Sequence, residues 1–220
     1  MGGDQRPKLT RKALPELRSI GIEAAVPSEE RAGQWVFFLH HFLVNDFLIA
    51  ASRLVNADPA LGWRRMLHDR ELQGTQPYLL VDGVRRRCVP DGFVHFTYGG
   101  EEIPIALEVD RDTEKQFQWK LKIRKLLAWV EGPYTTFAGT NQLTIAVVVQ
   151  GRTPERSAER LAFLLAWTRQ ELILRGKTAY GQLFLFSTTT PTTLSPHEYF
   201  FTAHWQTPFE PASRYALIEP

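Results

Sequence analysis

VPDGFVHFTYGGEEIPIALEVD, residues 89–110, is the stretch that decides the fold. It contains two β-prone runs, 92–98 and 103–110, on either side of Gly99 and Gly100. Glycine adopts the positive φ angles that a tight turn between antiparallel strands requires. The stretch therefore predicts a β-hairpin in the core of the protein.

Helix-like and strand-like patterns alternate on both sides of this hairpin. Upstream, we expect a long helix from Trp35 to about Val55, a short helix from Pro59 to Glu71, and strands at 78–81 and 84–89. Downstream, we expect a helix at 113–131, a buried strand at 143–149, a helix at 154–174, a strand at 183–186 and an edge strand from Tyr199 to His204. This order predicts an α/β fold of the mixed α+β kind, with a central mixed sheet flanked by helices.

The composition is that of a globular protein of ordinary size. The chain has 220 residues, 44% of them hydrophobic, and a formal net charge of +2. A balance this close to zero argues against a histone-like protein or a polybasic membrane anchor. The single cysteine excludes an internal disulfide and a cysteine-rich zinc site. With no signal-like or membrane-length apolar run, we expect a cytoplasmic protein without membrane contact.

Three carboxylates gather at one end of the predicted hairpin. Glu108 and Asp110 should project from the same face of their strand, and Asp91 should lie near the end where they emerge. Such carboxylates repel one another, and a divalent cation with oxygen ligands would neutralise them. The alternative is structural: Asp91 would cap a turn, and Asp110 would begin the next helix, where anions are favoured.

The segment that follows is strongly basic. Residues 111–125 hold six Lys and Arg against two Asp and Glu, so their net charge is 6 − 2 = +4. Glu114, Gln118 and Lys122 are spaced to form one polar row on a helix. Such a surface is suited to a phosphate backbone, although each basic run alone is typical of a solvated face. The DNA-contact candidates are Arg111, Lys115, Gln118, Lys125, Arg85 and Arg86.

Four strings in this region resemble the replication-relaxation family of bacterial and plasmid proteins. They are HFLVND (41–46), VPDGFV (89–94), ALEVDRDTE (106–114) and KIRKLLAW (122–129). The resemblance implies a core similar to the PD-(D/E)xK nuclease superfamily, which has a restriction-endonuclease-like αβββαβ order. It also implies two parts, a shortened winged-helix remnant or N-terminal arm at 1–33 and a nuclease-like α/β domain at 34–220.

The same resemblance implies roles for individual residues. Asp91 and Glu108 would bind Mg²⁺ or Mn²⁺, with the carbonyl of Val109 as a third oxygen ligand. Asp110 stands where the nuclease motif has Lys, so we expect Lys122 to supply that cation from the helix, unless the fold binds DNA without cutting it. The catalytic candidates are Asp91, Glu108, Asp110 and Lys122, and Glu114 is a supporting residue.

His41 and Asn45 are further supporting candidates, because their i, i+4 spacing places them on one helix face. They would orient a water or a phosphate, or else form a hydrogen-bonded pair that fixes the helix against the sheet. His40 is expected to face elsewhere. Trp119 and Trp129 are expected to be core residues rather than stacking platforms.

The function predicted from the sequence is DNA processing by metal-dependent hydrolysis or nicking, in plasmid, phage or mobile-element replication. The chain would then be a Mg²⁺-dependent endodeoxyribonuclease. The alternatives are a catalytically inactive DNA-binding or assembly module, and a subunit that docks on a larger machine through Trp and Phe surfaces. The expected partners are DNA and a larger replication or mobile-element complex, and a homodimer is also considered.

Overall fold

The computed structural model describes residues 29–219 of the chain, and their side chains from residue 38 onward. Residues from His40 onward form one compact unit. The N-terminal arm predicted for residues 1–33 falls almost entirely outside the described residues, and the boundary predicted between 33 and 34 lies inside helix α2 (Glu29–Ala57). Among residues 29–219, no helix combines the length and the apolar character needed to cross a membrane.

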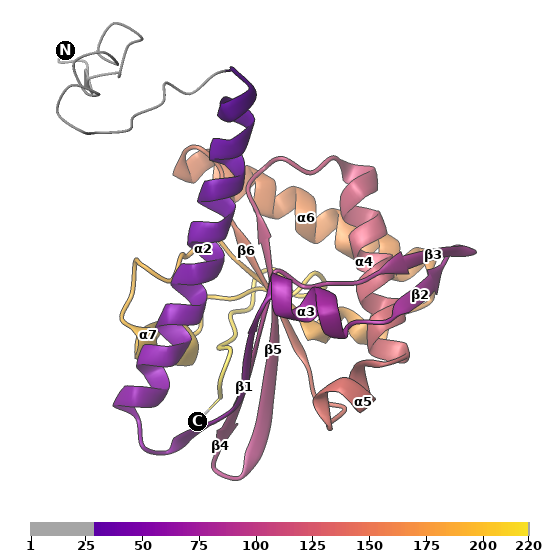
Figure 1. The fold of residues 1–220 in the computed structure, drawn as a ribbon. Coiled ribbons are helices and arrows are strands. Elements are labelled where there is room, and N and C mark those ends of the chain that lie inside the picture. The colour runs from indigo at the N-terminus through magenta and orange to yellow at the C-terminus, as the bar shows by residue number, and fades with distance from the viewer. Residues whose placement is uncertain (1–28, 220) are drawn as a thin grey trace, which may run out of the picture. The chain divides into compact units, whose positions relative to one another are not determined.

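The centre of this unit is a five-stranded mixed sheet with the order β1-β4-β5-β6-β7 (Figure 1). The strands are β1 (Leu61–His68), β4 (Gly92–Tyr98), β5 (Glu101–Asp110), β6 (Thr144–Val149) and β7 (Phe184–Ser187). Strands β1, β4 and β5 pair antiparallel, whereas β5, β6 and β7 pair parallel. The predicted hairpin is confirmed as β4 and β5, with positive φ angles of 58° at Gly99 and 90° at Gly100.

Helices cover both faces of the sheet, so the predicted mixed α/β fold is confirmed. On one face lie the part of α2 from His40 onward and α7 (Pro196–Phe201). On the other lie α4 (Gln116–Glu131), α5 (Tyr134–Ala138) and α6 (Pro154–Leu174). The connections that link the parallel strands β5 to β6 and β6 to β7 therefore run through α4 and α6 on the same side of the sheet.

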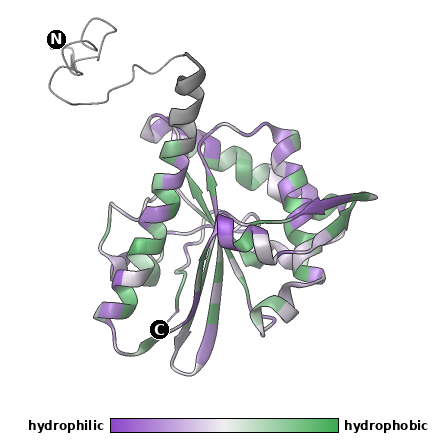
Figure 2. Cartoon of the chain, in the orientation of Figure 1, coloured by the Kyte–Doolittle hydropathy of each residue, from purple (hydrophilic) through white to green (hydrophobic). Residues whose placement is uncertain are grey.

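Alternation along the strands divides the hydrophobic core into two layers. Ile105 and Leu107 of β5 pack toward α2, whereas Ala106 packs toward α4 and α6. β6 contributes buried side chains to both layers, as expected for a central strand, and its ribbon is mostly green, the hydrophobic colour, in Figure 2. Trp119 and Trp129 are fully buried and donate to Thr168 and Gln76, so their assignment to the core is confirmed.

Shorter elements lie between β1 and β4 and after α6. They are α3 (Asp69–Thr75), β2 (Tyr78–Val81), β3 (Val84–Arg87) and the 3-10 helix η2 (Thr178–Leu183). Strands β2 and β3 form a separate two-stranded sheet, which contacts α4. The strand predicted at 84–89 ends at Arg87.

Two predicted elements are wrong. The short helix expected from Pro59 to Glu71 is strand β1 followed by α3. Its residues form a strand because β1 pairs along the whole of β4, and Trp63 stacks on Phe96 with ring centres 5.2 Å apart. Tertiary pairing has overridden the weak local helix preference.

The edge strand expected from Tyr199 to His204 is the helix α7 and the bend after it. Ser195 is the N-cap, since its hydroxyl accepts from the N–H of Glu198, and the carboxylate of Glu198 accepts from the N–H of Ser195. This reciprocal pair is a capping box, and Pro196 suits the first helical position. The sequence Ser-Pro-His-Glu at 195–198 therefore carried a helix signal stronger than the aromatic run after it.

Candidate functional site

Asp91 is held against the end of β5 by backbone and side-chain hydrogen bonds. Its N–H donates to the carbonyl of Leu107 at 2.9 Å, and its Oδ2 accepts from the N–H of Val109 at 2.8 Å. These bonds bracket Glu108, the residue between Leu107 and Val109. The hairpin thus brings Asp91 and Glu108 together, as the sequence predicted.

Lys122 reaches this pair from α4. Its Nζ lies 2.8 Å from Oε2 of Glu108 and 2.8 Å from Oε1 of Glu114. The Glu108 side chain is only 3% exposed and that of Lys122 is 16% exposed, so the ion pair is largely shielded from water. The Lys122 ammonium also lies 5.6 Å from the centre of the Trp119 ring. The predicted helical row of Glu114, Gln118 and Lys122 is not formed, because α4 starts at Gln116 and Glu114 precedes it. Lys122 nevertheless contacts both Glu108 and Glu114.

Burial and charge shift the protonation of these groups in opposing ways. Burial raises the pKa of Glu108 to about 7, against the opposing effect of Lys122. Burial lowers the pKa of Lys122, but the carboxylates of Glu108, Asp91 and Glu114 outweigh it and hold that pKa well above its ordinary value. The site therefore keeps a cation beside a carboxyl group that titrates near neutral pH.

His40, and not His41, contacts the site. Nε2 of His40 lies 3.3 Å from Oδ1 of Asp91. Burial opposes charge on both groups, yet their mutual contact raises the pKa of His40 and lowers that of Asp91. The expectation that His40 faces elsewhere is wrong, because the orientation in which α2 packs on the sheet turns this residue toward Asp91.

The two supporting residues predicted on α2 take other positions. The ring of His41 stacks on His68, with centres 6.0 Å apart. Asn45 is exposed to solvent. Within the part of the chain that the structure describes, neither a hydrogen bond between His41 and Asn45 nor a contact of either side chain with Asp91 or Glu108 is present.

Asp110 has a different partner from its neighbours in the sequence. Both of its oxygens accept from Arg160 of α6, Oδ1 from Nε and Oδ2 from Nη2, each at 2.7 Å. The same Nη2 also donates to the carbonyl of Glu114 at 2.7 Å. Asp110 shares the face of Glu108, as alternation predicts, but its carboxylate is bound by arginine. It does not begin a helix, since α4 starts at Gln116.

The basic and polar candidates lie in three parts of the chain: β3, the segment after β5, and α4. Lys115 and Gln118 are exposed at the start of α4, where the Lys115 N–H donates to Oε1 of Gln118 at 2.7 Å. Arg111, whose pKa is lowered by burial, and Lys125 are partly exposed. Arg85 is exposed on β3 and Arg86 beside it is partly buried.

Two residues of this neighbourhood were missed from the sequence. His40 adjoins a histidine that was chosen, and only the phase of the helix separates the two by about 100°. Arg160 is fifty positions from Asp110, and no spacing pattern joins them. The local charge of α6 gave no indication that one arginine would be buried.

The donor chemistry of Asp91 and Glu108 suits a hard cation. Mg²⁺ is commonly bound through one or two carboxylates, with waters and substrate phosphates completing its coordination. Among the described residues, no cluster of three or more His, Cys, Asp or Glu side chains is arranged to hold a metal ion. The two carboxylates thus fit a metal that binds together with a phosphate, rather than a cage made wholly of protein.

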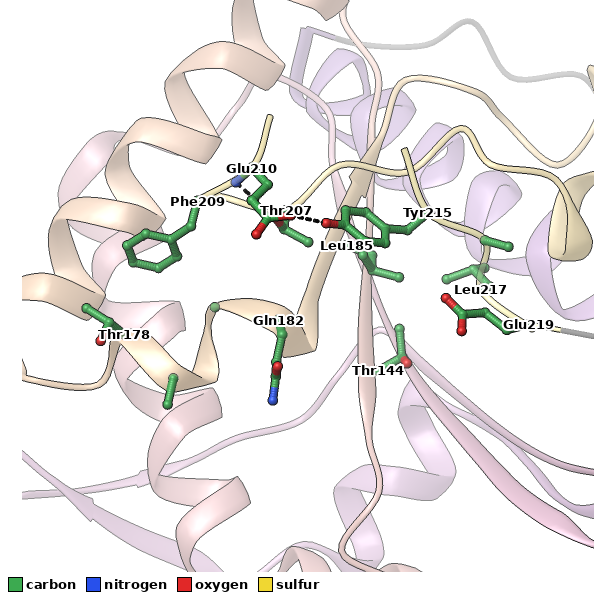
Figure 3. A pocket seen from close by; sticks show the side chains of 13 residues that line it. Thr144, Thr178, Gln182, Leu185, Thr207, Phe209, Glu210, Tyr215, Leu217 and Glu219 are labelled. Carbon is green, nitrogen blue, oxygen red and sulfur yellow. Dashed lines mark hydrogen bonds between the residues drawn. The ribbon is translucent and has the colours of Figure 1, made fainter. Parts of the chain in front are cut away.

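A cavity of about 500 Å³ opens elsewhere, beside the beginning of β6 (Figure 3). Thr144, the first residue of that strand, lines it, whereas Asp110 pairs with Val149 at the strand's other end. The polar groups that line it bind one another: Thr207 accepts from the N–H of Glu210, and Tyr215 donates to the Glu210 carboxylate. This cavity is separate from the acidic site.

Comparison of the chain with protein-family models, curated proteins and solved structures gave no match. The features that indicate a function are therefore the sequence motifs and the geometry of Asp91, Glu108 and Lys122.

Proposed function

We propose that this protein processes DNA by metal-dependent hydrolysis or nicking of a phosphodiester bond. The observation that carries the proposal is the contact between Lys122 and Glu108 beside Asp91. It supplies two carboxylates and one cation in a shielded site, although β5 has Asp110 where the nuclease motif has Lys. The setting of plasmid, phage or mobile-element replication rests on the resemblance to the replication-relaxation family.

Each residue has a distinct task in this proposal. Asp91 and Glu108 would hold Mg²⁺ or Mn²⁺, and when bound the ion would polarise the phosphate and lower the pKa of a bound water. Lys122 would stabilise the negative charge that develops on the phosphate. His40 would position Asp91 through its contact with Oδ1. Lys115 and Lys125 on α4 would bind the flanking backbone.

The test is nicking of supercoiled plasmid in Mn²⁺, with Glu108→Gln as the inactivating variant. We expect the wild type to nick the plasmid and the nicking rate of Glu108→Gln to be at least a hundredfold lower. The reason is that one carboxylate oxygen that would bind the metal is replaced by an amide NH2 group. Glu131→Gln is the matched control, since this carboxylate lies at the C-terminal end of α4, the helix that carries Lys122, and pairs with Lys177. The absence of wild-type nicking, or equal rates for Glu108→Gln and Glu131→Gln, would contradict the proposal.

A second candidate is a DNA-binding or assembly module without catalysis. The specific observation in its favour is that the ammonium of Lys122 already forms ion pairs with both Glu108 and Glu114. An ammonium in this position offsets part of the carboxylate charge that a metal ion would otherwise offset. It would serve as the structural centre under a basic helix.

The two candidates differ in their response to chelation. The binding module should keep its DNA affinity in EDTA, lose it as salt rises, and be weakened by Lys115→Ala with Lys125→Ala. Glu108→Gln should leave that affinity unchanged. Binding that persists in EDTA, combined with no nicking in Mn²⁺, would select this candidate over the first.

A further inference from the structure

Strands β2 and β3 form a hairpin arm outside the five-stranded sheet. The arm turns at Asp82 and Gly83, which both have positive φ angles, 50° and 76°. Its inner face is anchored, because Val81 is buried and Leu79 packs against the core under α4. The arm lies beside α4 in Figure 1. It is therefore a fixed part of the fold rather than a loose loop.

The outer face of the arm combines apolar and basic side chains. Tyr78 pairs with Arg87 and Leu80 pairs with Arg85 across the two strands. Leu80 is 70% exposed and Tyr78 is 54% exposed. The guanidinium carbons of Arg85 and Arg87 lie 5.1 and 4.6 Å from the centre of the Tyr78 ring. The outer face is thus a small apolar platform bordered by positive charge, and the arginines colour β3 purple in Figure 2.

No acidic group offsets this charge. Asp82, the carboxylate at the turn, is bound by Arg124 at 2.9 Å and by Arg175 at 2.8 Å. Among the residues described, no ion pair joins Arg85 or Arg87 to a carboxylate, and Nη1 of Arg87 donates only to the carbonyl of Gln73, at 3.1 Å. The charge of the arm is therefore available to an anionic partner.

The arm begins next to the acidic site. Only Cys88, Val89 and Pro90 separate Arg87 from Asp91, so their Cα atoms are at most about 14 Å apart. Cys88 in this segment is buried in the core layer under α4. A polyanion bound at the site would therefore have only this short segment to pass before it reached the arm.

We infer that the outer face of the β2–β3 arm binds a single strand of DNA that leads to or from the Asp91–Glu108 site. This inference rests on the proposed function, and it adds the form of the substrate. Exposed bases pack on aromatic and apolar side chains, and arginines bind the phosphates between them. A duplex keeps its bases stacked inside, so Tyr78 and Leu80 would have little to contact.

The experiment measures DNA affinity in EDTA, where cleavage is absent, by fluorescence anisotropy. The probes are a labelled 30-nucleotide single strand of mixed sequence and the duplex of the same sequence. The arm variant combines Tyr78→Ala, Leu80→Ser and Arg85→Gln. The matched control combines Leu174→Ser and Arg214→Gln, since Leu174 is 76% exposed and Arg214 is exposed in the C-terminal segment. Thermal unfolding confirms that both variants remain folded.

We expect the wild type to bind the single strand more tightly than the duplex. The arm variant should lose at least tenfold in single-strand affinity, and the control should lose less than twofold. Loss of the Arg85 contact should also reduce the slope of log affinity against log salt by about 0.7. Equal single-strand affinity of the two variants, or tighter binding of duplex by the wild type, would overturn the inference.

Nicking in Mn²⁺ is scored separately on the same wild-type protein. Failure of the proposed function appears as an absence of nicking with the binding pattern unchanged. Failure of the arm inference appears as unchanged binding in the arm variant, whether or not the protein nicks plasmid.

Discussion

Arg160 binds Asp110 through two parallel hydrogen bonds of 2.7 Å, from a guanidinium 5% exposed to a carboxylate with no exposure. This bidentate pair joins α6 to the end of β5. It explains how the fold accommodates an acidic residue at a buried strand end, two positions from Glu108. The pair fixes the sheet end on which Asp91 and Glu108 lie.

Removal of one partner from this pair should be costly. We expect Asp110→Ala to lower the free energy of unfolding by about 3–5 kcal/mol, because it leaves a buried guanidinium without its counter-ion. Urea unfolding at pH 7 measures the change. The double variant Asp110→Ala with Arg160→Met should lose less than the sum of the two single losses.

Arg156→Ala is the control for this prediction. Arg156 makes a similar contact with Asp112, but its side chain is 43% exposed. The decrease in unfolding free energy for Arg156→Ala should therefore be clearly smaller than for Asp110→Ala. Equal losses for Asp110→Ala and Arg156→Ala would contradict a special role for the buried pair.

The contact between Lys122 and Glu108 predicts a pH-dependent effect in metal-free buffer. The pKa of Glu108 is raised from 4.5 to about 7, so its contribution to stability is complete below pH 4.5 and is lost as the pH rises toward 7. Lys122→Met removes the charge that limits this shift. In this variant the pKa of Glu108 should be higher still, so the loss of stability should continue above pH 7.

Urea unfolding in EDTA at pH 5.5 and 8.5 tests this second prediction. The stability deficit of Lys122→Met relative to the wild type should be larger at pH 8.5. Lys125→Met, on the same helix, should show a similar deficit at both pH values. A deficit of Lys122→Met that does not change with pH would show that Glu108 is not controlled by this lysine.

The sequence predicted the hairpin and the carboxylate end because both depend on local rules. Strand alternation places Glu108 and Asp110 on one face, and paired glycines specify the turn. The convergence of Lys122 on Glu108 was also predictable, since a helix follows β5 directly and returns along it. Each of these features follows from residues close together in the sequence and from the known periodicity of strands and helices.

The remaining features depend on contacts between distant segments. His40 and His41 differ only in helix phase, which is set by how α2 packs on the sheet. Arg160 binds Asp110 from the next crossover helix, and no sequence period spans that separation. β1 is a strand because β4 offers it an edge, while its own residues favour helix and strand almost equally.

A network between Arg124, in the middle of α4, and the last turn of α6 predicts the response to acid. Oε1 of Glu171 accepts from Nε of Arg124 at 2.7 Å and from Nε of Arg175 at 3.1 Å. Burial raises the pKa of Glu171, but these two arginines outweigh burial and lower it below 4.5. Its contribution to stability is therefore present above pH 4.5 and is lost as the pH falls through the lowered value.

Glu171→Gln should accordingly be less stable than the wild type at pH 7, and the difference should shrink between pH 5 and pH 3. Urea unfolding across this range measures it. Glu159→Gln, an exposed carboxylate on the same helix, serves as the control and should show little change. A difference that stays constant down to pH 3 would contradict the lowered pKa.

Gly181 is required by a close approach between η2 and the C-terminal segment. A Cβ atom at this position would lie 2.4 Å from Cδ2 and 2.6 Å from Cε2 of Phe209. Gly181→Ala should therefore displace the Phe209 ring and cost about 1–3 kcal/mol of unfolding free energy. Gly74→Ala is the matched control: a Cβ there meets nothing within 4 Å, and alanine favours helix α3, so stability should stay the same or rise by up to about 1 kcal/mol. Thermal unfolding of both variants checks the prediction, and an equal effect of the two substitutions would show that Phe209 yields to the added methyl group without cost.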